Sequence, residues 1–102
     1  MNWRELYQQI FRDYIAKDSI LEQCKLQIPD TWEDIVSTAS AEIALIATPT
    51  QAQFIQINEK FNGLRFSIKF NNTITENNKY KIGQVIQKAE HDIMTLENKD
   101  RS

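Results

Sequence analysis

The sequence predicts an α+β fold, in which amphipathic helices pack on a short antiparallel β-hairpin in the order α-α-β-β-α. Two observations predict it. Apolar residues recur at helical spacing before residue 50 and again after residue 75, and they alternate at strand spacing between residues 53 and 70. At 102 residues, with 41% hydrophobic and 25% charged side chains, the chain is expected to form one domain, 1–102. Residues 98–102 should fray.

The first predicted helix covers residues 2–17, where apolar side chains recur every three or four positions. They are Trp3, Leu6, Tyr7, Ile10, Phe11, Tyr14 and Ile15. These side chains provide an aromatic row that suits either a core or a partner anchor, and helical spacing favours the core.

The stretch that follows is open to two interpretations. Ser19 and Glu22 have the spacing of a helix-capping pair. In contrast, apolar residues alternate with polar ones over 24–28, as in a short extra strand that ends before Pro29.

A second helix is predicted up to residue 46. Asp30 followed by Glu33 resembles a capping signal, and Pro49 ends the pattern. The apolar stripe consists of Trp32, Ile35, Val36, Ala39, Ile43 and Ile46.

Residues 53–70 predict a hairpin with a type I′ turn at Asn62-Gly63, because both residues tolerate positive φ. A two-residue loop sets the register. The expected pairs are Phe61 with Leu64, Glu59 with Phe66, Ile57 with Ile68, and Ile55 with Phe70. One face is then apolar apart from Glu59, and the other carries Lys60, Arg65 and Lys69 beside Phe54.

The last predicted helix follows the polar run 71–78, with Thr73 or Thr75 as its N-cap. Its apolar face consists of Ile82, Val85, Ile86, Ala89, Ile93 and Leu96. His91 lies off this face and is expected to be solvated. Gly83 lowers helix propensity by about 1 kcal/mol relative to alanine without overturning the periodicity.

Charge is unevenly distributed although the net charge is only −2. Residues 1–50 hold four basic and eight acidic side chains, whereas residues 51–102 hold eight basic and six acidic ones. Between Lys60 and Lys88 there are six cations and the single anion Glu76. This segment is expected to attract an acidic partner, either a protein surface or nucleic acid.

The residues carry no signature of a catalytic site, a metal site or a cofactor site. There is one cysteine and one histidine, and no glycine-rich phosphate loop. The longest apolar run, 43–47, is too short to cross a bilayer. We therefore expect a non-enzymatic cytoplasmic protein with no targeting segment.

The candidate binding residues are Lys60, Asn62, Arg65, Lys69 and Glu59. Glu59 suits a partner-binding acid or an ordinary carboxylate at the rim of the core, and the rim is favoured because unpaired charge is seldom buried. The first hypothesis is an inhibitor that occludes its target, such as a toxin-immunity protein or a phage anti-defence protein, and that docks these residues on an acidic surface. The alternative is a nucleic-acid-binding module that uses the same cations, with Phe54 for stacking. An open strand edge would also allow a homodimer.

The passage from Phe54 to Phe66 resembles one in a group of small, mostly uncharacterised bacterial and mobile-element proteins. In that group an apolar strand runs into Glu-Lys-Phe-Gly-Gly-Leu-Arg-Phe. Here the matching residues are Glu59, Lys60, Phe61, Gly63, Leu64, Arg65 and Phe66, and Asn62 replaces the first glycine. The resemblance implies helices on both sides of the hairpin and no established activity. The chain lacks the Cys-x-x-Cys-like tail of many members, which argues against a metal-linked role.

Overall fold

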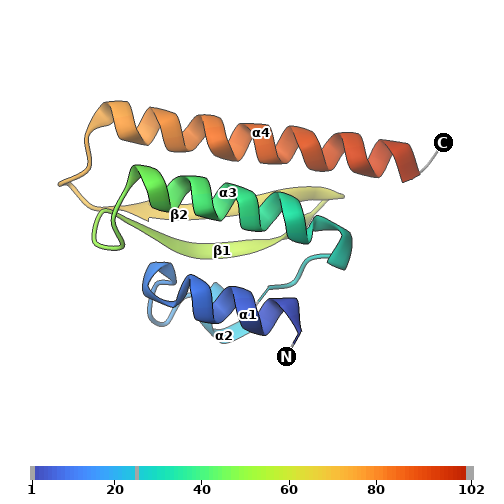
Figure 1. The fold of residues 1–102 in the computed structure, drawn as a ribbon, viewed down its shortest axis with the longest axis horizontal. Helices are drawn as coiled ribbons and strands as arrows, with labels where there is room; N and C mark the ends of the chain where they lie inside the picture. Colours follow the sequence, from blue (N-terminus) through green and yellow to red (C-terminus); the bar gives the residue numbers. More distant parts are fainter. Residues whose placement is uncertain (1, 25, 101–102) are drawn as a thin grey trace.

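The computed structural model describes residues 2–24 and 26–100. The elements in chain order are α1 (Trp3–Ile10), a 3₁₀ helix (Arg12–Tyr14), α2 (Ile20–Cys24), a second 3₁₀ helix (Asp30–Trp32), α3 (Glu33–Ile46), β1 (Ala52–Lys60), β2 (Gly63–Phe70) and α4 (Glu76–Asp100). The strands form a two-stranded antiparallel sheet. The α+β class is therefore confirmed, with helices before the hairpin and one helix after it (Figure 1).

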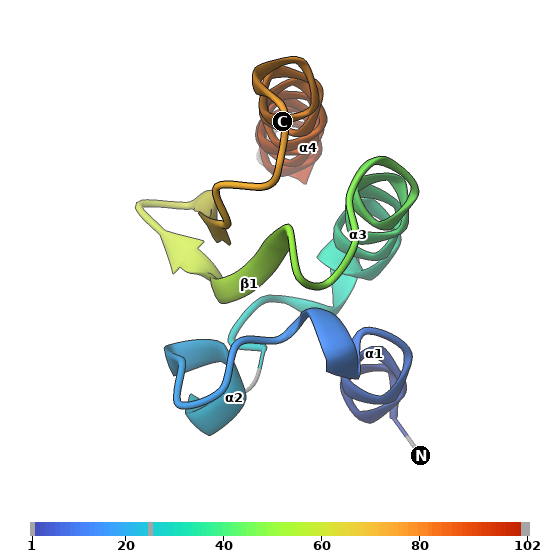
Figure 2. The ribbon, with the colours of Figure 1, turned by 90° about the vertical axis from the view of Figure 1, so that its left-hand side faces the viewer.

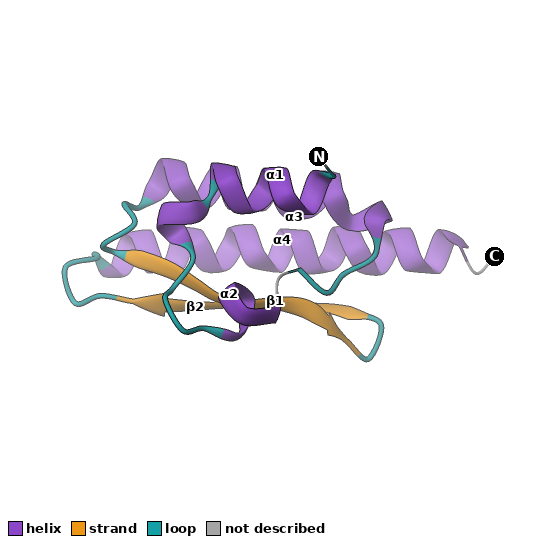
Figure 3. Ribbon diagram, turned by 90° about the horizontal axis from the view of Figure 1, so that it is seen from below, coloured by secondary structure: helices purple, strands orange, loops and turns teal. Residues whose placement is uncertain are grey.

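The three longer helices, α1, α3 and α4, lie on one side of the strands (Figure 3). Seen end on, α3 lies across the apolar face, with α4 on the β2 side and α1 on the β1 side (Figure 2). The short α2 lies below β1, apart from this layer. The opposite face of the hairpin is therefore open along β2.

The core is one continuous cluster that joins both ends of the chain to the hairpin. Phe54 is fully buried at its centre, with ring centroids 5.2 Å from Phe66, 5.5 Å from Tyr14 and 6.2 Å from Phe11. The aromatic row of the first helix thus packs in the core or against it, as its spacing predicts, although α1 ends at Ile10 and the 3₁₀ helix follows. Leu6 and Ile10, which the predicted stripe also included, are instead 48% and 63% exposed.

The predicted hairpin register is wrong, because the turn lies one residue earlier than expected and every cross-strand partner shifts by two positions. The turn lies at Phe61-Asn62, whose φ angles are 54° and 64°, and Gly63 begins β2 with an ordinary φ. Lys60 pairs with Gly63, and Glu59 with Leu64. Asn62 tolerates the left-handed region in either turn, whereas the earlier turn also places Phe61 there at a backbone cost. The observed register pairs Ile57 with Phe66, and both are buried.

A β-bulge between Phe54 and Gln56 is the second departure from the predicted pairing. The extra residue, Ile55, lets both Phe54 and Ile57 face the core, where they are 0% and 1% exposed. Without the bulge, strict alternation would turn Phe54 to the polar face. Burial of the larger aromatic side chain favours the irregular strand.

The short strand predicted at 24–28 does not form as a strand in the described residues. Cys24 ends α2, Lys25 lies outside the described residues, and Gln27 makes one isolated parallel bridge with Asn58. The alternation instead buries Leu26 and Ile28. Together with a similar bridge from Ile15 to Phe54, this segment covers part of the outer edge of β1.

Helix α4 begins as predicted, because the Thr75 hydroxyl accepts a hydrogen bond of 3.1 Å from the Asn78 amide. The helix continues through Asp100, so residues 98–100, which we expected to fray, are helical. Asp30 does not cap α3. Its carboxylate accepts a 3.0 Å hydrogen bond from the Trp3 indole and pairs with Arg4 at 2.7 Å. None of the described helices has both the length and the apolar character needed to span a membrane.

Candidate protein-binding surface on the hairpin

The tip of the hairpin presents an aromatic side chain to solvent. Phe61 is 90% exposed, the most exposed of the large apolar side chains. Its left-handed backbone is unfavourable for a bulky residue with a β-carbon, by roughly 1 kcal/mol. The Lys60 ammonium lies 5.4 Å from the centre of its ring. A purely structural hairpin gains no stability from a strained turn that exposes an aromatic ring. Both features are typical of a residue that contacts a partner.

Three cations line the face of the hairpin that points away from the long helices. On β2, Arg65 and Lys69 lie opposite Asn58 and Gln53, and Lys60 completes the set at the end of β1. Lys60 and Lys69 are exposed and Arg65 is half-buried. In the described part of the chain none of the three pairs with an anion, unlike Arg4, Lys79 and Lys88. We call these three residues the cationic strip.

The other two predicted site residues lie at the tip. Asn62 is the second central residue of the turn, and Glu59 is exposed opposite Leu64. Glu59 is therefore a rim carboxylate, the more favoured of the two interpretations. The structure brings Glu59, Lys60, Asn62 and Phe61 together, whereas Arg65 and Lys69 follow along β2, about 13 Å apart at strand spacing.

Two exposed residues near the tip, Phe61 and Met94, were not predicted from the sequence to lie at the surface. A shallow groove of about 270 Å³ separates the tip from the C-terminal half of α4. It is lined by residues 61–64 and by Glu90, Met94, Glu97 and Asn98. Met94 is 61% exposed there. A turn placed at Phe61-Asn62 instead of Asn62-Gly63 would have predicted an exposed Phe61. Met94 could have been predicted to be exposed because it lies off the apolar stripe of α4.

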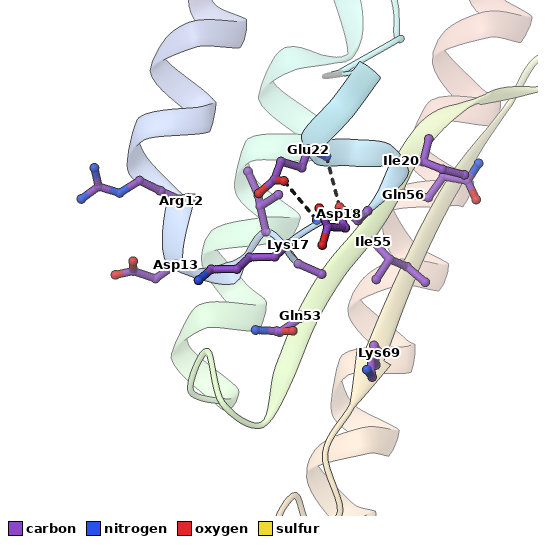
Figure 4. Close-up of a pocket in the computed structure, with 13 residues that line it drawn as sticks. Arg12, Asp13, Lys17, Asp18, Ile20, Glu22, Gln53, Ile55, Gln56 and Lys69 are labelled. Atoms are coloured by element: carbon purple, nitrogen blue, oxygen red, sulfur yellow. Dashed lines mark hydrogen bonds between the residues drawn. The ribbon is translucent and has the colours of Figure 1, made fainter.

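A hollow of about 820 Å³ lies between residues 12–22 and the outer side of the hairpin (Figure 4). Lys69 of the cationic strip and the bulge residue Ile55 line it. Its lining is balanced in charge, with three cations, Arg12, Lys17 and Lys69, and three carboxylates, Asp13, Asp18 and Glu22. Glu22 accepts a 3.0 Å hydrogen bond from the Asp18 amide, which holds the turn at its rim. The hollow extends the polar surface from β2 toward α2.

The prediction that Phe54 could stack on the bases of a nucleic acid is wrong. Phe54 is 0% exposed and lies in the core, because the bulge turns it away from the cationic strip. The strip itself then offers backbone attraction without an aromatic platform between its cations. The exposed aromatic side chains near the strip are Phe61 at the tip, 90% exposed, and Phe70 beside Lys69, 37% exposed, one at each end.

Among the described residues, no group of three or more histidine, cysteine, aspartate or glutamate side chains could hold a metal ion. No protein-family model, curated protein or solved structure matches the chain. The resemblance to small bacterial and mobile-element proteins therefore stays a prediction.

Proposed function

We propose that this chain is a small non-enzymatic protein that binds an acidic surface of another protein through its hairpin and acts by occlusion. The inhibitor classes suggested by the sequence, a toxin-immunity protein or a phage anti-defence protein, fit this mode. The observation that carries the proposal is the exposed Phe61 at a strained turn, next to three cations that have no anionic partner among the described residues.

The two features suit different parts of binding. An aromatic ring supplies most of the affinity when a pocket on the partner desolvates it, whereas exposed cations at the rim mainly speed association and select an acidic partner. Phe61 is thus the expected anchor, and Lys60, Arg65 and Lys69 are the steering residues.

A pull-down from the native host, with the tag at the C-terminus, tests the proposal. We expect wild-type protein to retain a protein partner after nuclease treatment, and we expect Phe61→Ala to lose it. The charge reversal Arg65→Glu with Lys69→Glu should weaken retention, and the retention that is left should no longer fall as salt is added.

The matched control is Lys79→Glu with Lys88→Glu, which changes the net charge equally on a different element. Equal retention by wild type and both hairpin variants would refute the hairpin as the binding surface. Recovery of nucleic acid in place of a protein would favour the alternative function.

A further inference from the structure

We propose that the outer edge of β2 accepts an extended segment of the partner as a third antiparallel or parallel strand, with acidic residues on the side of the cationic strip and apolar residues beneath α4. The inference rests on the proposed function and specifies its binding mode. It predicts main-chain pairing, which docking of Phe61 and the strip alone would not require.

The edge is long and unpaired. β2 has eight residues and β1 as its single neighbour in the sheet. Both isolated bridges fall on β1, and within 63–70 no backbone hydrogen bond links β2 to any described segment other than β1. A strand of this length presents a row of free N–H and C=O groups, which an extended chain can satisfy.

Helix α4 would cover the apolar face of an added strand. It runs along β2 on the side of the apolar face (Figures 1 and 2), and its exposed Met94 lies beside the start of β2. Gly83 lies about three turns earlier on the same helix face. A β-carbon at Gly83 would meet no described atom within 4 Å, so space is open along this side of the helix. At the far end of β2, Phe70 is 37% exposed.

The charge of the cationic strip determines which kind of strand can pair with the β2 edge. Arg65 and Lys69 project to one face of β2, four positions apart, and directly opposite residues on a neighbouring strand approach within about 5.5 Å. Carboxylates at the same spacing on the incoming strand would pair with both cations. The alternate side chains of that strand would face Phe70 and Met94, so the segment that fits is acidic on one face and apolar on the other.

A second copy of this chain fits less well. Any antiparallel pairing of two β2 strands that keeps their apolar faces together places Arg65 and Lys69 of both copies on one face. Like charges across strands are destabilising, so the strip opposes self-association through this edge.

The test uses the full chain and a peptide of alternating glutamate and valine that spans the 8 residues of β2. We expect saturable binding by fluorescence anisotropy and slower hydrogen exchange at every second amide of 63–70, because only alternate amides point outward. Methylation of the peptide nitrogens on one edge should abolish binding. Arg65→Glu with Lys69→Glu should weaken binding roughly tenfold, and a lysine-valine peptide should bind that variant better.

Lys69→Glu alone, at an exposed position, serves if the double variant fails to fold. The control Lys81→Glu with Lys88→Glu, two exposed cations on other faces of α4 than Gly83 and Met94, should bind as wild type. The proposal is overturned by absence of binding, by binding without protection of β2, by a dimer that protects β2 without peptide, or by preference for a single-stranded oligonucleotide. A host partner whose capture needs Arg65 and Lys69 but leaves β2 exchange unchanged would overturn strand addition alone and leave the proposed function standing.

Discussion

At the scale of single residues, Phe61 is the position where stability and binding oppose each other. Its backbone occupies the left-handed region at φ 54°, which asparagine adopts at lower cost. In exchange the exposed ring gains only a cation–π contact with Lys60, worth about 0.5 kcal/mol at a solvated site. The backbone penalty of roughly 1 kcal/mol is larger.

We therefore expect Phe61→Asn to raise the free energy of unfolding by about 0.5 kcal/mol while abolishing capture of the partner. Urea denaturation and the pull-down would measure the two effects. A loss of stability would show that the ring packs in the native hairpin in a way that its 90% exposure does not suggest.

Asp30 provides a pH-dependent contribution to stability. Its hydrogen bond from the Trp3 indole, and then the hydrogen bond and charge of Arg4, hold the pKa of this carboxyl below its ordinary value of 3.8. A group whose pKa is depressed by folding stabilises the native state above its unfolded pKa, and that contribution is lost as the pH falls through the folded pKa.

The prediction for Asp30→Asn is a smaller loss of stability between neutral pH and about pH 3 than wild type shows, since the variant has no carboxylate to protonate there. Urea midpoints at the two pH values would give the difference. Asp34→Asn, at an exposed carboxylate with no side-chain hydrogen bond in the described chain, is the comparison. Equal pH dependence of Asp30→Asn and wild type would contradict the role assigned to the pair.

At the scale of elements, a buried polar contact joins α1 to α3. The Tyr7 and Ser40 hydroxyls are 2.7 Å apart, and the two residues are 2% and 0% exposed. Burial raises the pKa of the Tyr7 phenol well above its ordinary value, so the phenol stays neutral. The contact satisfies two hydroxyl groups that water cannot reach.

Ser40→Ala should destabilise the protein by about 1–3 kcal/mol, because it leaves the Tyr7 hydroxyl buried without its partner. Adding Tyr7→Phe to that variant should recover part of the loss, as removal of both hydroxyls leaves no unsatisfied group. A double-mutant cycle by urea denaturation would measure the coupling. Strictly additive effects would mean that the two hydroxyls do not depend on each other.

The elements also show where sequence reasoning succeeds. Strong periodicity placed α3 and α4, and the polar run before α4 offered Thr73 or Thr75 as its cap, of which Thr75 caps the helix. These features depend on residues close together in the chain. The turn and the bulge were missed because each depends on a tertiary choice. Phe54 reaches the core only if Ile55 is left out of the regular pairing. The local sequence alone does not show whether Phe54 or Ile55 will face the core.

At the scale of the whole molecule, the same limits apply to the candidate site. The cations Lys60, Arg65 and Lys69 were predictable from strand alternation, which the bulge does not disturb near the tip. The exposure of Phe61 and the free edge beneath α4 depend on register and on packing between distant segments. Those features required the structure, and they are the ones that carry the proposals.

One hydrogen bond joins residues that are 65 positions apart in the chain. The buried Trp32 indole, at the start of α3, donates a 2.8 Å hydrogen bond to the Glu97 carboxylate near the end of α4. Because α4 packs on both α3 and β2, this contact links the last helix to the core that α1 and the hairpin share. Loss of this hydrogen bond should therefore lower the stability of the entire domain.

We expect Glu97→Ala to lower the free energy of unfolding by about 1–3 kcal/mol, since the buried indole N–H loses its acceptor. Glu97→Gln, which keeps an oxygen acceptor, should lose less. Tryptophan fluorescence and far-ultraviolet circular dichroism should give coincident urea transitions in wild type and in both variants, as a single cooperative domain requires. If fluorescence instead changed before helicity in Glu97→Ala, α4 would be separating from a core that remains folded, and the one-domain interpretation would be wrong.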